Sequence, residues 1–175
     1  MKPTSSDWGA AAGLAIGGAC GMAGSFMSDA ALRQELWGVD GTALVVAAAL
    51  LAVKYLRSGQ DLLAAGFLVY GAGQTLVLSD APAGLAASVP TFGSGLALWS
   101  AGLVIVSLPG SFPWWSRAAA AVAAVVFLAT AAQIFAGAQI LPTGAPLPSL
   151  GYPFMVLAFI GWIWRLLRPA SLKAT

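Results

Sequence analysis

The chain has 175 residues, of which 59% are hydrophobic and only 8% are charged, and its formal net charge is +2. A soluble domain keeps roughly a quarter of its residues charged because its surface faces water. Fourteen charged side chains cannot cover a water-exposed surface of this size, so the composition excludes an ordinary soluble domain and indicates a chain surrounded mainly by lipid. The small net charge also argues against a nucleic-acid partner, which would require a strong excess of positive charge.

Six stretches are apolar for long enough to cross a bilayer, whose hydrocarbon core of about 30 Å needs about 20 residues per helix. They cover residues 8–27, 41–57, 62–79, 91–108, 114–137 and 150–167. The sequence therefore predicts an all-α, polytopic integral membrane protein. Its six transmembrane helices form one compact bundle over residues 1–175, with no soluble domain.

Basic residues predict how this bundle is oriented, because they gather on the cytoplasmic side of a membrane. Counted along the six spans, one side receives seven of the eight basic residues and the other receives only Arg33. The seven are Lys2, Lys54, Arg57, Arg117, Arg165, Arg168 and Lys173. Five tryptophans fall at the same ends, where their rings favour the headgroup layer: Trp8, Trp114, Trp115, Trp162 and Trp164. We therefore predict a bacterial inner-membrane protein with both termini in the cytoplasm.

The first apolar stretch has an alternative interpretation as a cleaved leader ending at Cys20. A lipoprotein signal places a branched apolar residue three positions before the cysteine, whereas this chain has Gly17 there, and Asp7 interrupts the positive leader. The sequence therefore favours a retained first span.

A ladder of glycines runs through the first span at intervals of four residues: Gly9, Gly13, Gly17 and Gly21. This spacing keeps small residues on one face of a helix, where another helix backbone can approach closely. The ladder predicts a packing face, used either inside the monomer or for contact with a second copy or another subunit.

Polar side chains in the outer halves of the spans form the candidate binding site. Tyr70 and Gln74 belong to the third span, and Thr130 and Gln133 to the fifth. Buried hydroxyl and amide groups need hydrogen-bond partners in hydrocarbon, so these residues either bond between helices or line a pocket open to the periplasm. Such a pocket would suit a neutral or amphiphilic ligand.

The absence of certain residue types excludes much chemistry. The chain has no histidine and one cysteine, which excludes histidine-ligated haem, histidine-based zinc sites and a Ser-His-Asp triad. We expect no metal and no cofactor. The acidic residues are expected at span ends or in loops, and Lys54 is expected to extend toward the cytoplasmic headgroups. The acidic residues are Asp7, Asp29, Glu35, Asp40, Asp61 and Asp80.

Three functions are compatible with this inventory, and no motif identifies a family. The first is an accessory or assembly subunit of a membrane complex, or a homo-oligomer, without catalytic residues. The second is a small uncoupled transporter, channel or amphiphile-binding protein that uses the polar pocket. The third is a lipid-modifying enzyme with surface carboxylates from Asp29, Glu35, Asp40 and Asp80.

Overall fold

The computed structural model describes residues 2–79 and 84–168, and within these ranges every regular element is an α-helix. The helices are α1 (Ser5–Phe26), α2 (Ala30–Arg57), α3 (Asp61–Ser79), α4 (Val89–Ser107), α5 (Trp114–Phe135) and α6 (Gly151–Leu167). Five of them are long and apolar enough to cross a membrane, and α6 is a shorter apolar helix of 17 residues. The prediction of an all-α bundle with six helices is confirmed.

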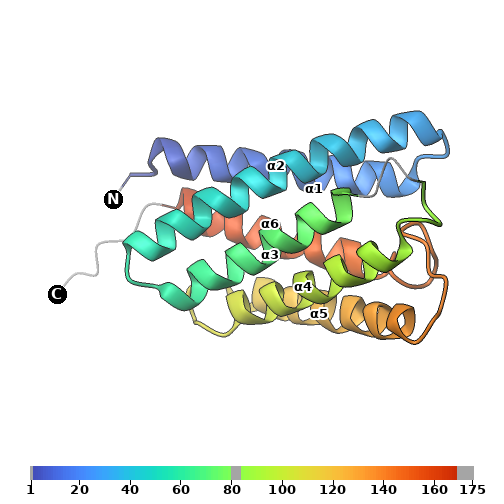
Figure 1. Cartoon of the computed structure of the whole chain (residues 1–175). Coiled ribbons are helices and arrows are strands. Elements are labelled where there is room, and N and C mark those ends of the chain that lie inside the picture. The colour runs from blue at the N-terminus through green and yellow to red at the C-terminus, as the bar shows by residue number, and fades with distance from the viewer. Residues whose placement is uncertain (1, 80–83, 169–175) are drawn as a thin grey trace.

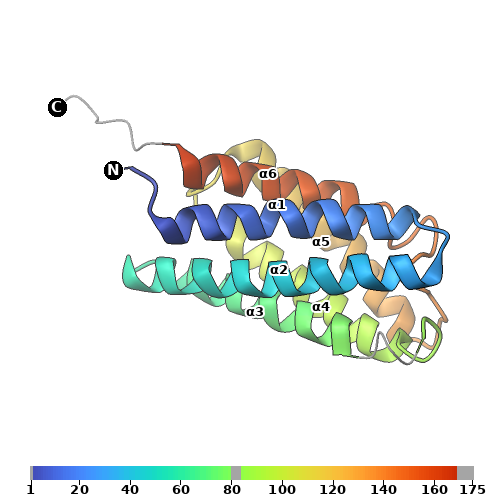
Figure 2. The ribbon, with the colours of Figure 1, turned by 90° about the horizontal axis from the view of Figure 1, so that it is seen from above.

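The helices form a closed ring in chain order. Each helix packs against its neighbours in the sequence, and α6 completes the ring by packing against α1. Successive helices run in opposite directions (Figures 1 and 2). One end of the bundle therefore carries the N-terminus, the α2–α3 and α4–α5 connections and the end of α6. We call this the terminal end, and the end with the other three connections the distal end.

The α2 helix is eleven residues longer than the predicted span, which began at residue 41. Asp29 caps its first turn by accepting a hydrogen bond from the Leu32 amide at 2.8 Å. Residues 30–40, which lie outside the predicted spans, therefore form the beginning of α2. As a result Asp40, which was expected at a span end, lies in the eleventh position of a 28-residue helix.

The glycine ladder of α1 faces α2 along most of its length. A Cβ atom on Gly13 would lie 2.7 Å from the backbone oxygen of Ala43, and one on Gly17 would lie 3.2 Å from the backbone oxygen of Asp40. Gly9 and Gly21 also face α2, where their neighbours are the side chains of Leu50 and Asp40. The ladder therefore packs two helices of the same chain backbone to backbone.

Helices α3 and α4 approach each other by the same means. A Cβ atom on Gly73 would lie 2.8 Å from the backbone oxygen of Gly95, and one on Gly102 would lie 2.9 Å from that of Gly66. Close backbone approach gains van der Waals contact that larger side chains would prevent. Two of the six helix contacts in the ring, α1 with α2 and α3 with α4, are thus lined by glycine.

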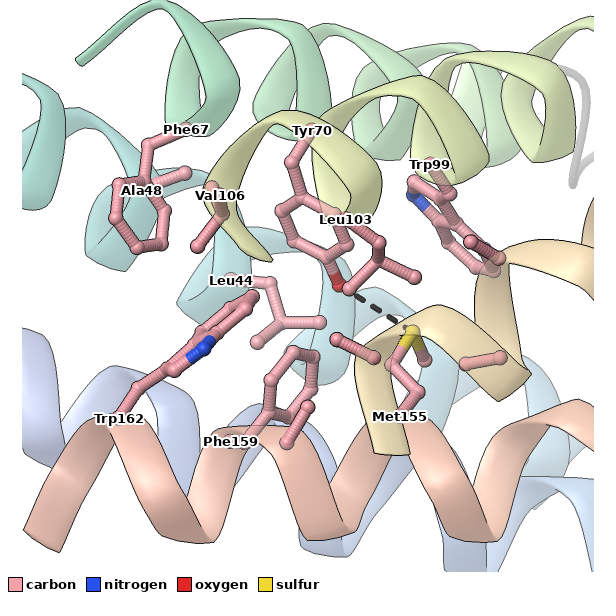
Figure 3. Packing of buried hydrophobic residues seen from close by; sticks show 14 of the residues in the cluster. Leu44, Ala48, Phe67, Tyr70, Trp99, Leu103, Val106, Met155, Phe159 and Trp162 are labelled. Carbon is pink, nitrogen blue, oxygen red and sulfur yellow. Dashed lines mark hydrogen bonds between the residues drawn. The ribbon is translucent and has the colours of Figure 1, made fainter. Parts of the chain in front are cut away.

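Aromatic side chains fill the interior of the ring. Phe67 and Tyr70 of α3 reach across to Trp162 of α6, with ring centroids 5.1 and 6.3 Å apart in edge-to-face geometry. Each of these three side chains is 1% exposed. Figure 3 shows them meeting between the helices together with Phe159. Trp162, expected in the headgroup layer, is instead a central core residue.

The terminal end is held by charged side chains. Asp7 forms a capping box with Thr4, whose amide donates to the Asp7 carboxylate at 2.9 Å. Lys54 of α2 forms a salt bridge with the same carboxylate, so it pairs with Asp7 where the sequence predicted extension toward headgroups. Arg117 donates to the backbone oxygen of Ser107 at 2.6 Å, and Arg165 donates to that of Ser111 at 3.1 Å.

The backbone contact of Gly13 generates a prediction with a matched control. Gly13→Ala should lower the free energy of unfolding by about 1–3 kcal/mol, because the new methyl group would collide with a carbonyl group that cannot move away. Gly38→Ala should instead stabilise the protein slightly, since nothing lies within 4 Å of a Cβ atom there and alanine favours a helix. Thermal unfolding in detergent, followed by circular dichroism, measures both. A Gly13→Ala protein at least as stable as the unchanged chain would contradict the close contact of α1 with α2.

Candidate functional site

A cavity of about 430 Å³ lies at the distal end of the ring. Its lining comes from α1, α2, α3, α4 and α6, from the connection around residues 84–88, and from Pro142. Helix α5 contributes none of the lining residues. The cavity is therefore the part of the ring interior that the aromatic core leaves unfilled, and it lies beside the distal connections.

The most polar part of the cavity is formed by Asp40 and Gln74. Gln74 is 1% exposed, and its Nε2 donates to Asp40 Oδ2 at 3.4 Å. The glycine ladder creates room for this carboxylate, because a Cβ atom on Gly21 would lie 3.0 Å from Asp40 Cγ. The pair joins α2 to α3 at the cavity wall.

Two buried polar atoms of the lining have no hydrogen-bond partner within the described part of the chain. They are Oε1 of Gln74 and Nε1 of Trp99. Native proteins satisfy nearly all of their buried polar groups, so an acceptor and a donor left open beside a cavity indicate a place for a bound molecule or water. The one other such atom, Ser116 Oγ, lies elsewhere, where α5 packs against Gly161 of α6.

Apolar side chains form the floor of the cavity toward the terminal end. Met155 and Phe159 of α6 line it, and the Tyr70 hydroxyl lies just behind them and donates to Met155 Sδ at 3.7 Å (Figure 3). Tyr152 lines the cavity nearer the distal connections, and its hydroxyl donates to the Pro142 backbone oxygen at 2.9 Å. The polar pair of Asp40 and Gln74 is thus set in a mostly apolar chamber.

Arg33 is the one basic side chain among the described lining residues. Its Nη1 donates to the backbone oxygen of Met27 at 3.1 Å, and its guanidinium carbon lies 5.7 Å from the ring centroid of Trp37. It forms no salt bridge with Asp40 within the described ranges. Arg33 therefore contacts the α1–α2 connection through Met27 and the first turns of α2 through Trp37.

The structure brings only one of the four predicted binding residues to the cavity. Gln74 lines it, whereas Tyr70 belongs to the aromatic core behind its floor. Thr130 is fully buried on α5 and donates to the Val126 backbone oxygen at 2.8 Å, and Gln133 is exposed on the outside of the same helix. The predicted four-residue lining is corrected accordingly, because α5 packs its inner face closely against α4 and α6.

Asp40 and Trp99 were missed by the sequence reasoning. Asp40 directly precedes the second predicted span, because a carboxylate usually ends an apolar run. The signal that places it inside was the spacing of Trp37, Asp40, Leu44 and Ala47, which continues one helical face at intervals of three and four residues. Trp99 carried no comparable signal, since a tryptophan in an apolar helix usually only packs.

The carboxylates proposed for an enzyme lie in different settings. Asp29 caps α2, Glu35 is exposed, and Asp40 lines the cavity. Asp80 lies outside the described residues. Within the described ranges no three His, Cys, Asp or Glu side chains are grouped as metal ligands would be.

No protein-family model matches this chain, and neither a curated protein nor a solved structure is similar enough to it to suggest a relationship.

Proposed function

We propose that this chain is an integral membrane protein that binds a small amphiphilic molecule in its distal cavity. In this proposal all six helices cross the bacterial inner membrane, both termini lie in the cytoplasm, and the cavity opens toward the periplasmic side. The observation that carries the proposal is the pair of unpartnered polar atoms, Gln74 Oε1 and Trp99 Nε1, in a chamber of ligand-binding size.

The distribution of basic residues supports the orientation. Lys2, Lys54, Arg57, Arg117, Arg165 and Arg168 belong to the terminal end, and Arg33 to the distal end. Lys173 lies outside the described residues. Cytoplasmic ends of membrane proteins carry such an excess of lysine and arginine. Large apolar side chains on the outside of the ring, such as Val125 and Phe135, are more than half exposed, as contact with lipid would require.

The size and lining of the cavity support ligand binding. Binding pockets for small molecules have volumes of about 300–1,000 Å³ and combine apolar walls with a few polar groups that orient the ligand. This cavity, at about 430 Å³, fits that description. An amphiphile would place its apolar part against Phe159 and Met155 and its polar part near Gln74.

The aromatic core favours a binding protein over an open channel. Phe67, Tyr70 and Trp162 occupy the ring interior between the cavity and the terminal end, each 1% exposed. A molecule in the cavity would have to displace these side chains to cross. The alternating-access movement that a transporter needs would therefore have to reorganise the core.

The accessory-subunit hypothesis has lost its main sequence feature, because the glycine ladder is covered by α2 of the same chain. The lipid-modifying enzyme would require several carboxylates to act together, and the described ones, Asp29, Glu35 and Asp40, have separate environments. Neither hypothesis accounts for the unpartnered atoms in the cavity.

Cysteine labelling tests the membrane topology. In a Cys20→Ala background, Ser28→Cys at the distal end should react with a membrane-impermeant maleimide added to intact spheroplasts. Ser58→Cys at the terminal end should react only after the membrane is permeabilised, because the two exposed positions lie at opposite ends of the bundle. Labelling of both cysteines from the same side would contradict the proposed orientation.

A cavity-filling substitution tests ligand binding. The protein is reconstituted in phosphatidylcholine nanodiscs and heated with three ten-carbon probes: decanol, decylammonium and decanoate. At least one probe should raise the melting temperature, since a ligand at a hundred times its Kd stabilises a protein by about 2.7 kcal/mol. Ser25→Phe should remove this shift by filling the cavity from its wall.

Ser94→Phe is the matched control. Ser94 is half-buried and bonded to its own helix, as Ser25 is, but it does not line the cavity. The Ser94→Phe protein should keep the full rise in melting temperature that the probe causes. The binding proposal fails if no probe stabilises the unchanged protein, or if Ser25→Phe responds as the control does.

A further inference from the structure

Asp40 and Asp7 are acidic residues that face a neighbouring helix, but their environments differ. Asp7 is matched by the Lys54 ammonium group and by the amide of Thr4. Asp40 has no lysine or arginine nitrogen within 4 Å in the described part of the chain, and Gln74 supplies its one side-chain hydrogen bond there. A carboxylate removed from water without a cationic partner is costly, so a cationic ligand beside Asp40 would stabilise its ionised form.

The orientation of the Gln74 amide adds a second acceptor. Gln74 Nε2 donates to Asp40 Oδ2, so the amide is turned with Nε2 toward that carboxyl group and Oε1 away from it. Oε1 is the atom left without a partner. Asp40 and Gln74 Oε1 thus give the cavity lining two oxygen acceptors, and a ligand must bring the donors.

The other charged and aromatic groups of the cavity are compatible with a positively charged ligand that donates hydrogen bonds. Arg33 donates a hydrogen bond to the Met27 carbonyl and lies over the Trp37 ring, and Asp40 is the one carboxyl group among the described lining residues. Trp99 and Phe159 give the walls aromatic rings, which attract cations and pack against apolar chains. An anionic ligand would meet the Asp40 charge directly.

We infer that the cavity selects an organic cation that carries N–H donors, namely a protonated primary or secondary amine with an apolar body. Its N–H groups donate to the Asp40 carboxylate and to Gln74 Oε1, and its apolar part lies against the α6 side of the chamber. This inference rests on the proposed binding function and adds the chemical class of the ligand. Charge attraction sets the preference for a cation, and the two acceptors set the preference for N–H groups over a quaternary amine.

Affinities of three matched probes test this selection. Decylammonium, decyltrimethylammonium and decanol share one alkyl chain and differ only in charge and in N–H donors. Titrated into the nanodisc-embedded protein, decylammonium should bind at least ten times more tightly than either of the others. Partition into the lipid is measured with empty nanodiscs and subtracted.

Asp40→Asn should weaken decylammonium at least tenfold, a loss of about 1.4 kcal/mol, and leave decanol unchanged. Glu35→Gln is the matched control, because it removes a negative charge from the same end of α2 at an exposed position outside the cavity lining. It should change the affinity for decylammonium less than twofold. Gln74→Leu should weaken decylammonium while decanol keeps its affinity, and it serves as the deciding variant if Asp40→Asn does not fold.

The outcomes separate this inference from the proposed function. If decanol binds as tightly as decylammonium, or if neither Asp40→Asn nor Gln74→Leu weakens the amine, the selection of a cation is wrong while the cavity remains a binding site. If none of the probes binds the unchanged protein, the proposed function itself fails. A preference for decyltrimethylammonium over decylammonium would overturn the role of the N–H donors.

Discussion

A closed ring of six helices has an interior, and the filling of that interior determines the rest of this structure. Backbone contacts through Gly13 and Gly73 bring neighbouring helices close together, but they do not fill the space between α3 and α6 on opposite sides of the ring. Large aromatic side chains such as Phe67 and Trp162 fill it over the terminal part. Toward the distal end the filling stops at Phe159 and Met155, and the cavity begins.

The helices were predictable because each is a long apolar run bounded by charged residues, glycine or proline. Five spans were placed within a few residues of the observed helices, and the exception is α2. Its beginning was hidden because residues 29–40 contain four charges, which in water-facing segments mark a loop. The side chain of Asp29 starts a helix there, and the face shared by Trp37 and Leu44 continues it.

The candidate site was less predictable than the fold because it depends on how helices are rotated against one another. Gln74 lines the cavity, and its depth in the third span was the reason to expect it in a pocket. Thr130 lies at a similar depth, but the rotation of α5 buries it against its own backbone. Depth follows from counting residues, whereas the direction of a side chain follows from packing that only the three-dimensional arrangement defines.

The contact between Gly21 and the Asp40 carboxyl group links the glycine ladder to the chemistry of the chamber. Because Gly21 has only a hydrogen atom as its side chain, there is room for the Asp40 carboxyl group beside α1. A larger residue there would displace the Asp40 carboxyl group, although both polar residues of the pair would remain in the sequence. The position of the Asp40 carboxyl group therefore depends on the distance between α1 and α2, and the width of the cavity depends on the same distance.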